Sequence, residues 1–134
     1  MEYLAHIVKD GRVQTIYEHL TGTAAIASEF GAPFGAADEA RFAGMLHDIG
    51  KYSAEFQRRL RGGAAVDHST AGAQEAFRRG DLPAALAIAG HHGGIPDCGN
   101  RNDQPDDATL QGRIKREIPS CREWQSEITA PHAA

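Results

Sequence analysis

The sequence predicts an all-α protein, and three features of its residue pattern support that fold class. Apolar side chains recur at three- and four-residue spacing in several segments, which is the spacing of one helix face. Glycine and proline lie between these segments, where helices begin or end. No segment has the alternation of apolar and polar residues that indicates a strand. We therefore expect a compact helical bundle without a β-sheet.

Seven helices are predicted after an extended start. The first has a stripe formed by Ile16, Leu20 and Ala24, and the second has a wide apolar face. Asp38, Ser53 and Asp81 are predicted N-caps, and the helix after Asp81 is almost wholly apolar. The last helix is expected to be weak. The predicted helical segments are residues 13–30, 38–49, 54–60, 67–79, 81–90, 109–118 and 122–128.

The composition restricts the class of protein. A chain of 134 residues is expected to form one domain, and a net charge of -4 argues against a uniformly basic nucleic-acid binder. No apolar run is long enough to cross a membrane, and the N-terminus lacks a signal-like core, so no membrane contact and a cytoplasmic location are expected. Cys98 and Cys121 are far apart, which favours free thiols in a reducing compartment.

Histidines next to an aspartate predict a metal site in the bundle. His47 and Asp48 are adjacent at the end of an apolar helix, and Lys51 follows them. Imidazole and carboxylate are both good ligands for divalent transition metals, and a carboxylate can bridge two ions. Further histidines lie at helix ends or core edges, where packing in a bundle can bring them together. These are His19, His68, His91 and His92.

Each of these histidines also has a simpler explanation when taken alone. His19 could be a hydrogen-bonded residue at the core edge, and the His91–His92 pair could lie on the surface. The His47–Asp48 pair could be a hydrogen bond at a helix end. His6 and His132, in terminal segments, are expected to have structural or solvent roles. The whole set, with glycines beside both pairs, favours metal binding.

The same residues carry a resemblance to a known family. The stretches Tyr3–His6, Glu18–Leu20, Gly44–Tyr52, Phe56–Leu60, Asp67–Ala73 and Gly90–Gly94 occur in the order found in that family. The chain resembles the HD nuclease domain of the type I CRISPR-associated nuclease–helicase, within the HD superfamily of metal-dependent phosphohydrolases. The resemblance covers residues 3–97, and it implies a compact HD-domain helical bundle with a central metal site.

The resemblance implies a function and its ligands. The protein would be a metal-dependent nuclease that hydrolyses single-stranded DNA in CRISPR interference by a one- or two-metal mechanism. A helicase domain or subunit and the target-recognition complex would be its partners. His19, His47 and Asp48 would hold one ion, and Asp48, His68, His91 and His92 would hold the other. Manganese, iron, cobalt or nickel is expected, magnesium is an alternative, and Asp48 and Lys51 would be the catalytic residues.

The chain departs from the family pattern after the His91–His92 pair. The family supplies another metal-binding aspartate from a downstream helix, and nothing in residues 98–134 reproduces that context. Asp103, Asp106 and Asp107 come too early. We therefore expect an HD core at 1–97, and at 98–134 a polar loop and a C-terminal helical segment of the same domain, either truncated or a short variant.

Local basic residues provide the expected substrate contacts. Lys51, Arg58, Arg59 and Arg61 are the predicted substrate-binding residues, because a negatively charged nuclease needs a local path for the phosphate backbone. Less specific basic spots occur at Arg78–Arg79 and Arg113–Arg116. Tyr52 and Phe56 could stack on bases, although a core position is favoured for Phe56. Two alternatives remain: an HD phosphohydrolase acting on a nucleotide or cyclic dinucleotide, and a truncated, non-catalytic HD module.

Overall fold

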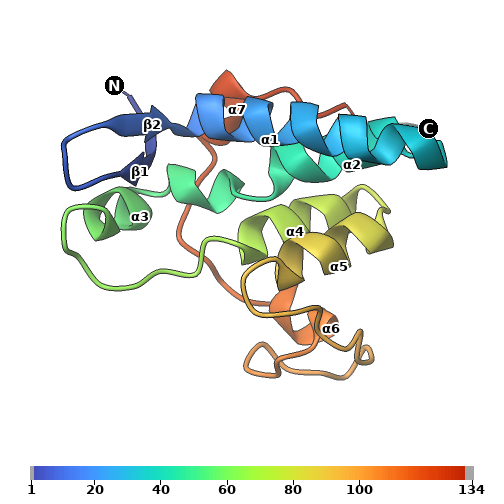
Figure 1. Ribbon diagram of the computed structural model, residues 1–134. Coiled ribbons are helices and arrows are strands. Elements are labelled where there is room, and N and C mark those ends of the chain that lie inside the picture. Colours follow the sequence, from blue (N-terminus) through green and yellow to red (C-terminus); the bar gives the residue numbers. More distant parts are fainter. Residues whose placement is uncertain (1, 132–134) are drawn as a thin grey trace.

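The computed structural model describes residues 2–131 and confirms a mainly helical fold. Two helix pairs form its two layers. In Figure 1 α1 (Ile16–Gly31) and α2 (Ala37–Leu46) lie above α4 (Thr70–Arg78) and α5 (Leu82–Gly90). The interior is filled by apolar side chains from both layers, with Leu20, Phe42, Leu46 and Ile88 almost fully buried. The metal-site histidines therefore lie on a packed scaffold.

Short elements complete the chain around these layers. Two 3-10 helices flank α2, and α3 follows the second of them. The C-terminal third passes beneath α5 through α6 and returns to the upper layer at α7 (Figure 1). The bounds are β1 Leu4–Ile7, β2 Val13–Thr15, η1 Ala32–Phe34, η2 Ile49–Tyr52, α3 Ala54–Arg59, α6 Leu110–Arg113 and α7 Trp124–Glu127.

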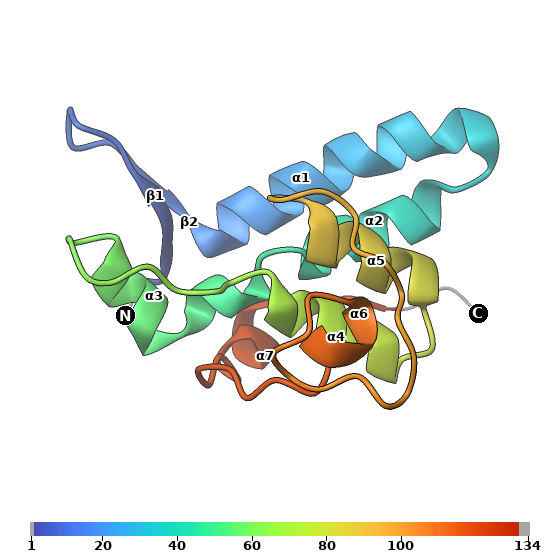
Figure 2. The same cartoon turned by 90° about the horizontal axis from the view of Figure 1, so that it is seen from below.

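The prediction that the chain has no strand was wrong. Strands β1 and β2 pair antiparallel as a hairpin that projects past the start of α1 (Figure 2). The strands are too short to show alternation, so the pattern was not visible in the sequence. Helix α1 also begins later than predicted. Thr15 caps it in a capping box, with its hydroxyl accepting from the Glu18 amide at 3.1 Å and the Glu18 carboxylate accepting from the Thr15 amide at 3.0 Å.

Other helix boundaries were partly wrong. Asp38 lies in the first turn of α2, and Ala36 occupies the N-cap position. The helix predicted at 109–118 is reduced to α6, because Gly112 weakens a helix interior and Pro119 disfavours helical backbone before it. By contrast, two caps are confirmed, since Ser53 accepts from the Phe56 amide and Asp81 from the Ala84 amide.

Two further predictions concern the ends of the chain and the membrane. Among residues 2–131, no helix is both long and apolar enough to cross a membrane. The role predicted for His132 lies outside the described residues.

Candidate metal centre

Glycines bring the elements of the metal centre close together. A Cβ atom added to Gly44 would lie 2.8 Å from the Ala24 Cα atom, so α1 and α2 approach closely there. A Cβ atom on Gly50 would lie 2.3 Å from the carbonyl oxygen of His68. Since real Cβ atoms are not found at such distances, glycine is needed for both contacts. Together they bring α1 and the start of α4 against the His47–Asp48 turn.

Asp48 lies at the centre of the cluster, and its side chain is almost fully buried. Its Oδ2 atom lies 2.8 Å from His19 Nε2 and 3.2 Å from His47 Nε2. Its Oδ1 atom faces the other histidines, with Nε2 distances of 3.1 Å to His91, 3.7 Å to His68 and 4.0 Å to His92. The two carboxylate oxygens therefore face two different sets of imidazoles, as a bridging ligand requires.

These ligand atoms form two groups that could each hold a metal ion. The first contains His19, His47 and Asp48, and the second contains Asp48, His68, His91 and His92. Within each group, the ligand atoms all lie within 4.8 Å of one another. The imidazole and carboxylate donors suit divalent transition metals. All six residues predicted as metal ligands are thus brought together.

Backbone carbonyls fix the orientation of two of the imidazoles. His47 Nδ1 lies 2.6 Å from the carbonyl oxygen of Gly44, and His91 Nδ1 lies 2.6 Å from that of Ile88. A carbonyl oxygen can only accept, so both Nδ1 atoms donate an N–H there. Each Nε2 atom then faces the cluster, where it offers a lone pair to a metal ion when the imidazole is neutral and donates to Asp48 when the imidazole is protonated.

The electrostatics of the cluster favour the metal-ligand forms of Asp48, His68 and His92, whereas His91 is shifted toward its protonated form. Burial alone would raise the pKa of Asp48, but hydrogen bonds from His19, His47 and His91 outweigh it and lower the pKa far below its usual range. Burial lowers the pKa of His68 and of His92, which favours the neutral imidazoles that bind metal. Burial also acts on His91, but the Asp48 hydrogen bond raises its pKa overall.

Lys51, the predicted catalytic and substrate-binding lysine, is buried beside Asp48. Its Nζ atom lies 3.4 Å from Asp48 Oδ2 and donates to the carbonyl oxygen of Ala5 at 3.5 Å. The ammonium group also lies 5.3 Å from the ring centroid of Phe56, which is itself buried. In this structure Lys51 therefore balances the charge of Asp48.

The arginines predicted to bind substrate lie on α3 and just after it. All three are exposed, and Arg58 and Arg61, but not Arg59, line a cavity of about 670 Å³ together with Tyr3 and Tyr52. None of the six candidate metal ligands lines this cavity. Tyr52, considered for base stacking, is almost fully buried, and its hydroxyl donates to Glu127 at 2.7 Å.

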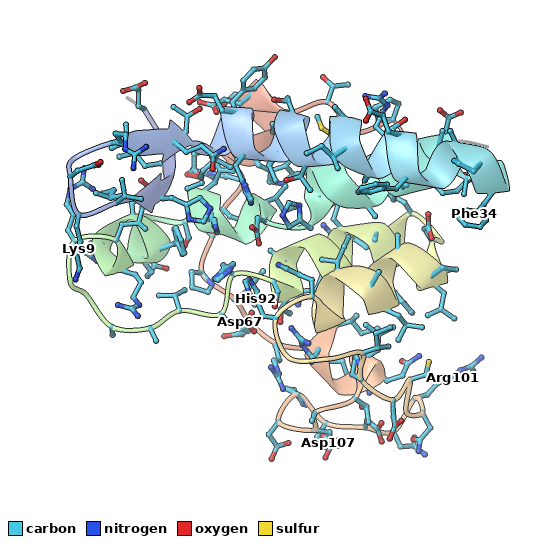
Figure 3. The ribbon with its side chains drawn as sticks, viewed as in Figure 1. Lys9, Phe34, Asp67, His92, Arg101 and Asp107 are labelled. Atoms are coloured by element: carbon cyan, nitrogen blue, oxygen red, sulfur yellow. The ribbon has the colours of Figure 1, made fainter. Side chains whose placement is uncertain are left out.

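A second cavity adjoins the metal ligands directly. It has a volume of about 460 Å³ and is lined by His92 and Arg113 together with Asp67, Ser69 and residues of the 93–96 turn. Figure 3 shows His92 and Asp67 close to each other beside the start of α4. The His92 side chain is 57% exposed, so the second group opens to solvent.

The sequence did not indicate that two other residues lie beside the centre, His6 and Arg113. The His6 ring lies edge-on to the His19 ring, with centroids 5.1 Å apart, because the unpredicted hairpin brings it there. Arg113 contacts the segments that carry His68 and His91, although no spacing in the sequence indicated this. Asp103 and Asp107 accept hydrogen bonds within their own loop, from the amides of Asn100 and Gln104.

The fold and the site together define a class: a helical domain with a His/Asp centre suited to divalent metals. The HD-domain profile matches residues 16–120, which is most of the chain and contains all six candidate ligands. The chain therefore belongs to the HD-domain family, a family of metal-dependent phosphohydrolases. A comparison with curated proteins found no match.

Proposed function

We propose that this HD domain is a metal-dependent phosphodiesterase that cuts single-stranded nucleic acid. The observation that carries the proposal is the exposed second ligand group, which shares Asp48 with the first. A polymer has to present an internal phosphate to the ligands without entering a closed pocket. The open position of His92 allows this.

The ligand set fits manganese, iron, cobalt or nickel better than magnesium, which prefers oxygen ligands. His19, His47 and Asp48 would hold one ion, and Asp48, His68, His91 and His92 the other. When bound, such ions supply Lewis acidity, which makes a nucleophile available near neutral pH and stabilises charge at the phosphorus. We propose that magnesium could replace these ions only at a higher magnesium concentration.

Residues of the chain itself would bind and orient the strand. We propose that Lys51, whose charge lies beside Asp48, offsets the negative charge that a phosphate brings to the centre. Arg58 and Arg61 would bind phosphates away from the scissile bond, and the neighbouring Tyr3 ring offers a face for a base. Arg59, exposed on α3, would extend this contact.

The resemblance to the CRISPR-associated nuclease domain supports DNA as the polymer. In that setting, a helicase domain or subunit and the target-recognition complex would deliver the single strand. The protein would then act as the nuclease of CRISPR interference.

A specific observation favours a second candidate function. The cavity of about 460 Å³ beside His92 lies within the range of small-molecule sites, roughly 300–1,000 Å³. Arg113, which lines it, could contact a nucleotide phosphate. A phosphohydrolase acting on a nucleotide or cyclic dinucleotide would use the same metal ligands.

Cleavage assays distinguish these functions. The purified chain is incubated with manganese or nickel and end-labelled single-stranded DNA or RNA, and separately with nucleotides and cyclic dinucleotides. We expect cleavage of the DNA that is lost in Asp48→Asn and retained in Asp106→Asn, an exposed control. Turnover of nucleotides with intact polymer would support the second candidate. No turnover and no bound metal by elemental analysis would leave a non-catalytic module and refute both enzymatic functions.

A further inference from the structure

Arg113 ends α6 and lies between the start of α4 and the end of α5. Its Nη2 atom lies 2.9 Å from Ser69 Oγ and 3.0 Å from Thr70 Oγ1, and its Nε atom lies 3.2 Å from Thr70 Oγ1. Its Nη1 atom donates to the carbonyl oxygen of Ala89 at 2.5 Å. One half-buried guanidinium thus joins two helix ends that are distant in sequence.

Both helix ends carry ligands of the second group. Ser69 directly follows His68, and Ala89 lies two residues before His91. The Arg113 contacts therefore connect the backbone segments on which the three imidazoles depend. Arginine suits this role because its donors are fixed in one plane and can bind acceptors on two sides at once.

Neighbouring hydrogen bonds make this connection rigid. Asp67, the residue before His68, accepts from the Thr70 hydroxyl at 2.6 Å and from the Thr70 amide at 3.1 Å. The Gln74 side chain donates to the carbonyl oxygens of Arg113 and Arg116, at 3.3 Å and 2.9 Å. Arg113 is thus held to α4 through its backbone as well as its side chain.

We infer that Arg113 is a positioning residue of the metal centre, which sets the distance between His68 and the His91–His92 pair by tying the start of α4 to the end of α5. The inference rests on the proposed function, since it concerns the second metal. Groups hydrogen-bonded directly to metal ligands typically change metal affinity by 10–100-fold when removed, and we expect Arg113, which bonds the residues beside the ligands, to act within that range. The first group has no hydrogen bond to Arg113, so its affinity is expected to stay unchanged.

Metal binding by single-group proteins tests this directly. His19→Ala leaves the second group, and His68→Ala leaves the first. The manganese dissociation constant is measured by calorimetry in each background, with and without Arg113→Met. We expect a 10–100-fold weaker constant in the His19→Ala background and less than a threefold change in the His68→Ala background. Arg122→Met, at an exposed arginine, is the matched control and is expected to change neither.

Two milder variants keep the test decisive if Arg113→Met does not fold. Arg113→Lys keeps the charge but loses the planar fork, and Ser69→Ala removes one acceptor. Both are expected to weaken manganese binding in the His19→Ala background by a smaller factor, with a folded circular dichroism spectrum. Unchanged constants in the variants that fold would overturn the inference while leaving the proposed function intact. Equal weakening in both backgrounds would also overturn it, because it would indicate a general loss of structure.

The outcomes also separate this inference from the proposed function. If His19→Ala binds no manganese while the unmodified chain does, the second group is no site and the inference fails. If the unmodified chain binds no divalent ion, the proposed function itself fails.

Discussion

Gly72 lies where α4 crosses α2, and an added methyl group there is predicted to destabilise the fold. Its Cβ atom would lie 2.2 Å from the carbonyl oxygen of Leu46 and 3.0 Å from Ile88 Cγ2. The first neighbour is backbone, so the helices have to move apart. Gly22 in α1 is the matched control, since a Cβ atom there meets nothing within 4 Å.

The two substitutions should change stability in opposite directions. Replacing glycine by alanine in a helix interior favours folding by about 1 kcal/mol, and this is the whole effect expected for Gly22→Ala. For Gly72→Ala the same gain is opposed by an overpacking cost of about 1–3 kcal/mol. Because the clash is with backbone, we expect the upper part of that range and a net loss of about 1–2 kcal/mol.

Urea unfolding of the two variants and the unmodified chain measures these differences. Leu46 directly precedes His47, so Gly72→Ala should also weaken manganese binding. A Gly72→Ala variant as stable as Gly22→Ala would refute the reasoning, because it would mean that α2 and α4 separate at no cost.

Two further predictions concern ionisable groups. Burial opposes the charge of Glu75, but hydrogen bonds from Arg78 and Arg79 outweigh it and lower its pKa below the usual 4.5. The contribution of Glu75 to stability is therefore present above pH 4.5 and lost as the pH falls through the lowered pKa. In Glu75→Gln, the free energy of unfolding should therefore fall less steeply with decreasing pH on the acid side. An unchanged slope would contradict this. Burial raises the pKa of the Cys121 thiol to about 11. A thiol reagent at pH 7.5 should therefore modify the exposed Cys98 quickly and Cys121 only after unfolding. Rapid reaction of both thiols would contradict this, because it would show that Cys121 is accessible in the folded protein.

The sequence predicted the parts of the fold that depend on local chemistry. Ser53 and Asp81 are N-caps because their side chains accept amide protons that the helix leaves unpaired, which residue type and position alone indicate. The metal-ligand set could also be predicted from the sequence, since the adjacent His47 and Asp48 form the motif of the HD family. Their convergence with His19 follows from the close contact that Gly44 allows between α1 and α2.

The parts that depend on tertiary contacts could not be predicted in this way. The hairpin has strands of three and four residues, whose pairing with each other decides their conformation. The burial of Lys51 follows from its position between Asp48 and the hairpin carbonyl of Ala5. Arg113 reaches Ser69 and Ala89, beside the metal ligands, because residues 91–113 fold back onto α4 and α5. The residues next to Arg113 in the sequence do not indicate these contacts.

The division of Asp48 between two sets of imidazoles has a thermodynamic consequence. Two ions that share one carboxylate cannot bind independently, and whichever binds first changes the affinity of the second by a factor that is the same in either order. Repulsion between the two positive ions weakens binding of the second ion, whereas alignment of the shared carboxylate by the first ion strengthens it. The occupancy of one group would therefore depend on the supply of metal to the other, and a half-loaded protein would be a distinct state with its own range of metal concentration.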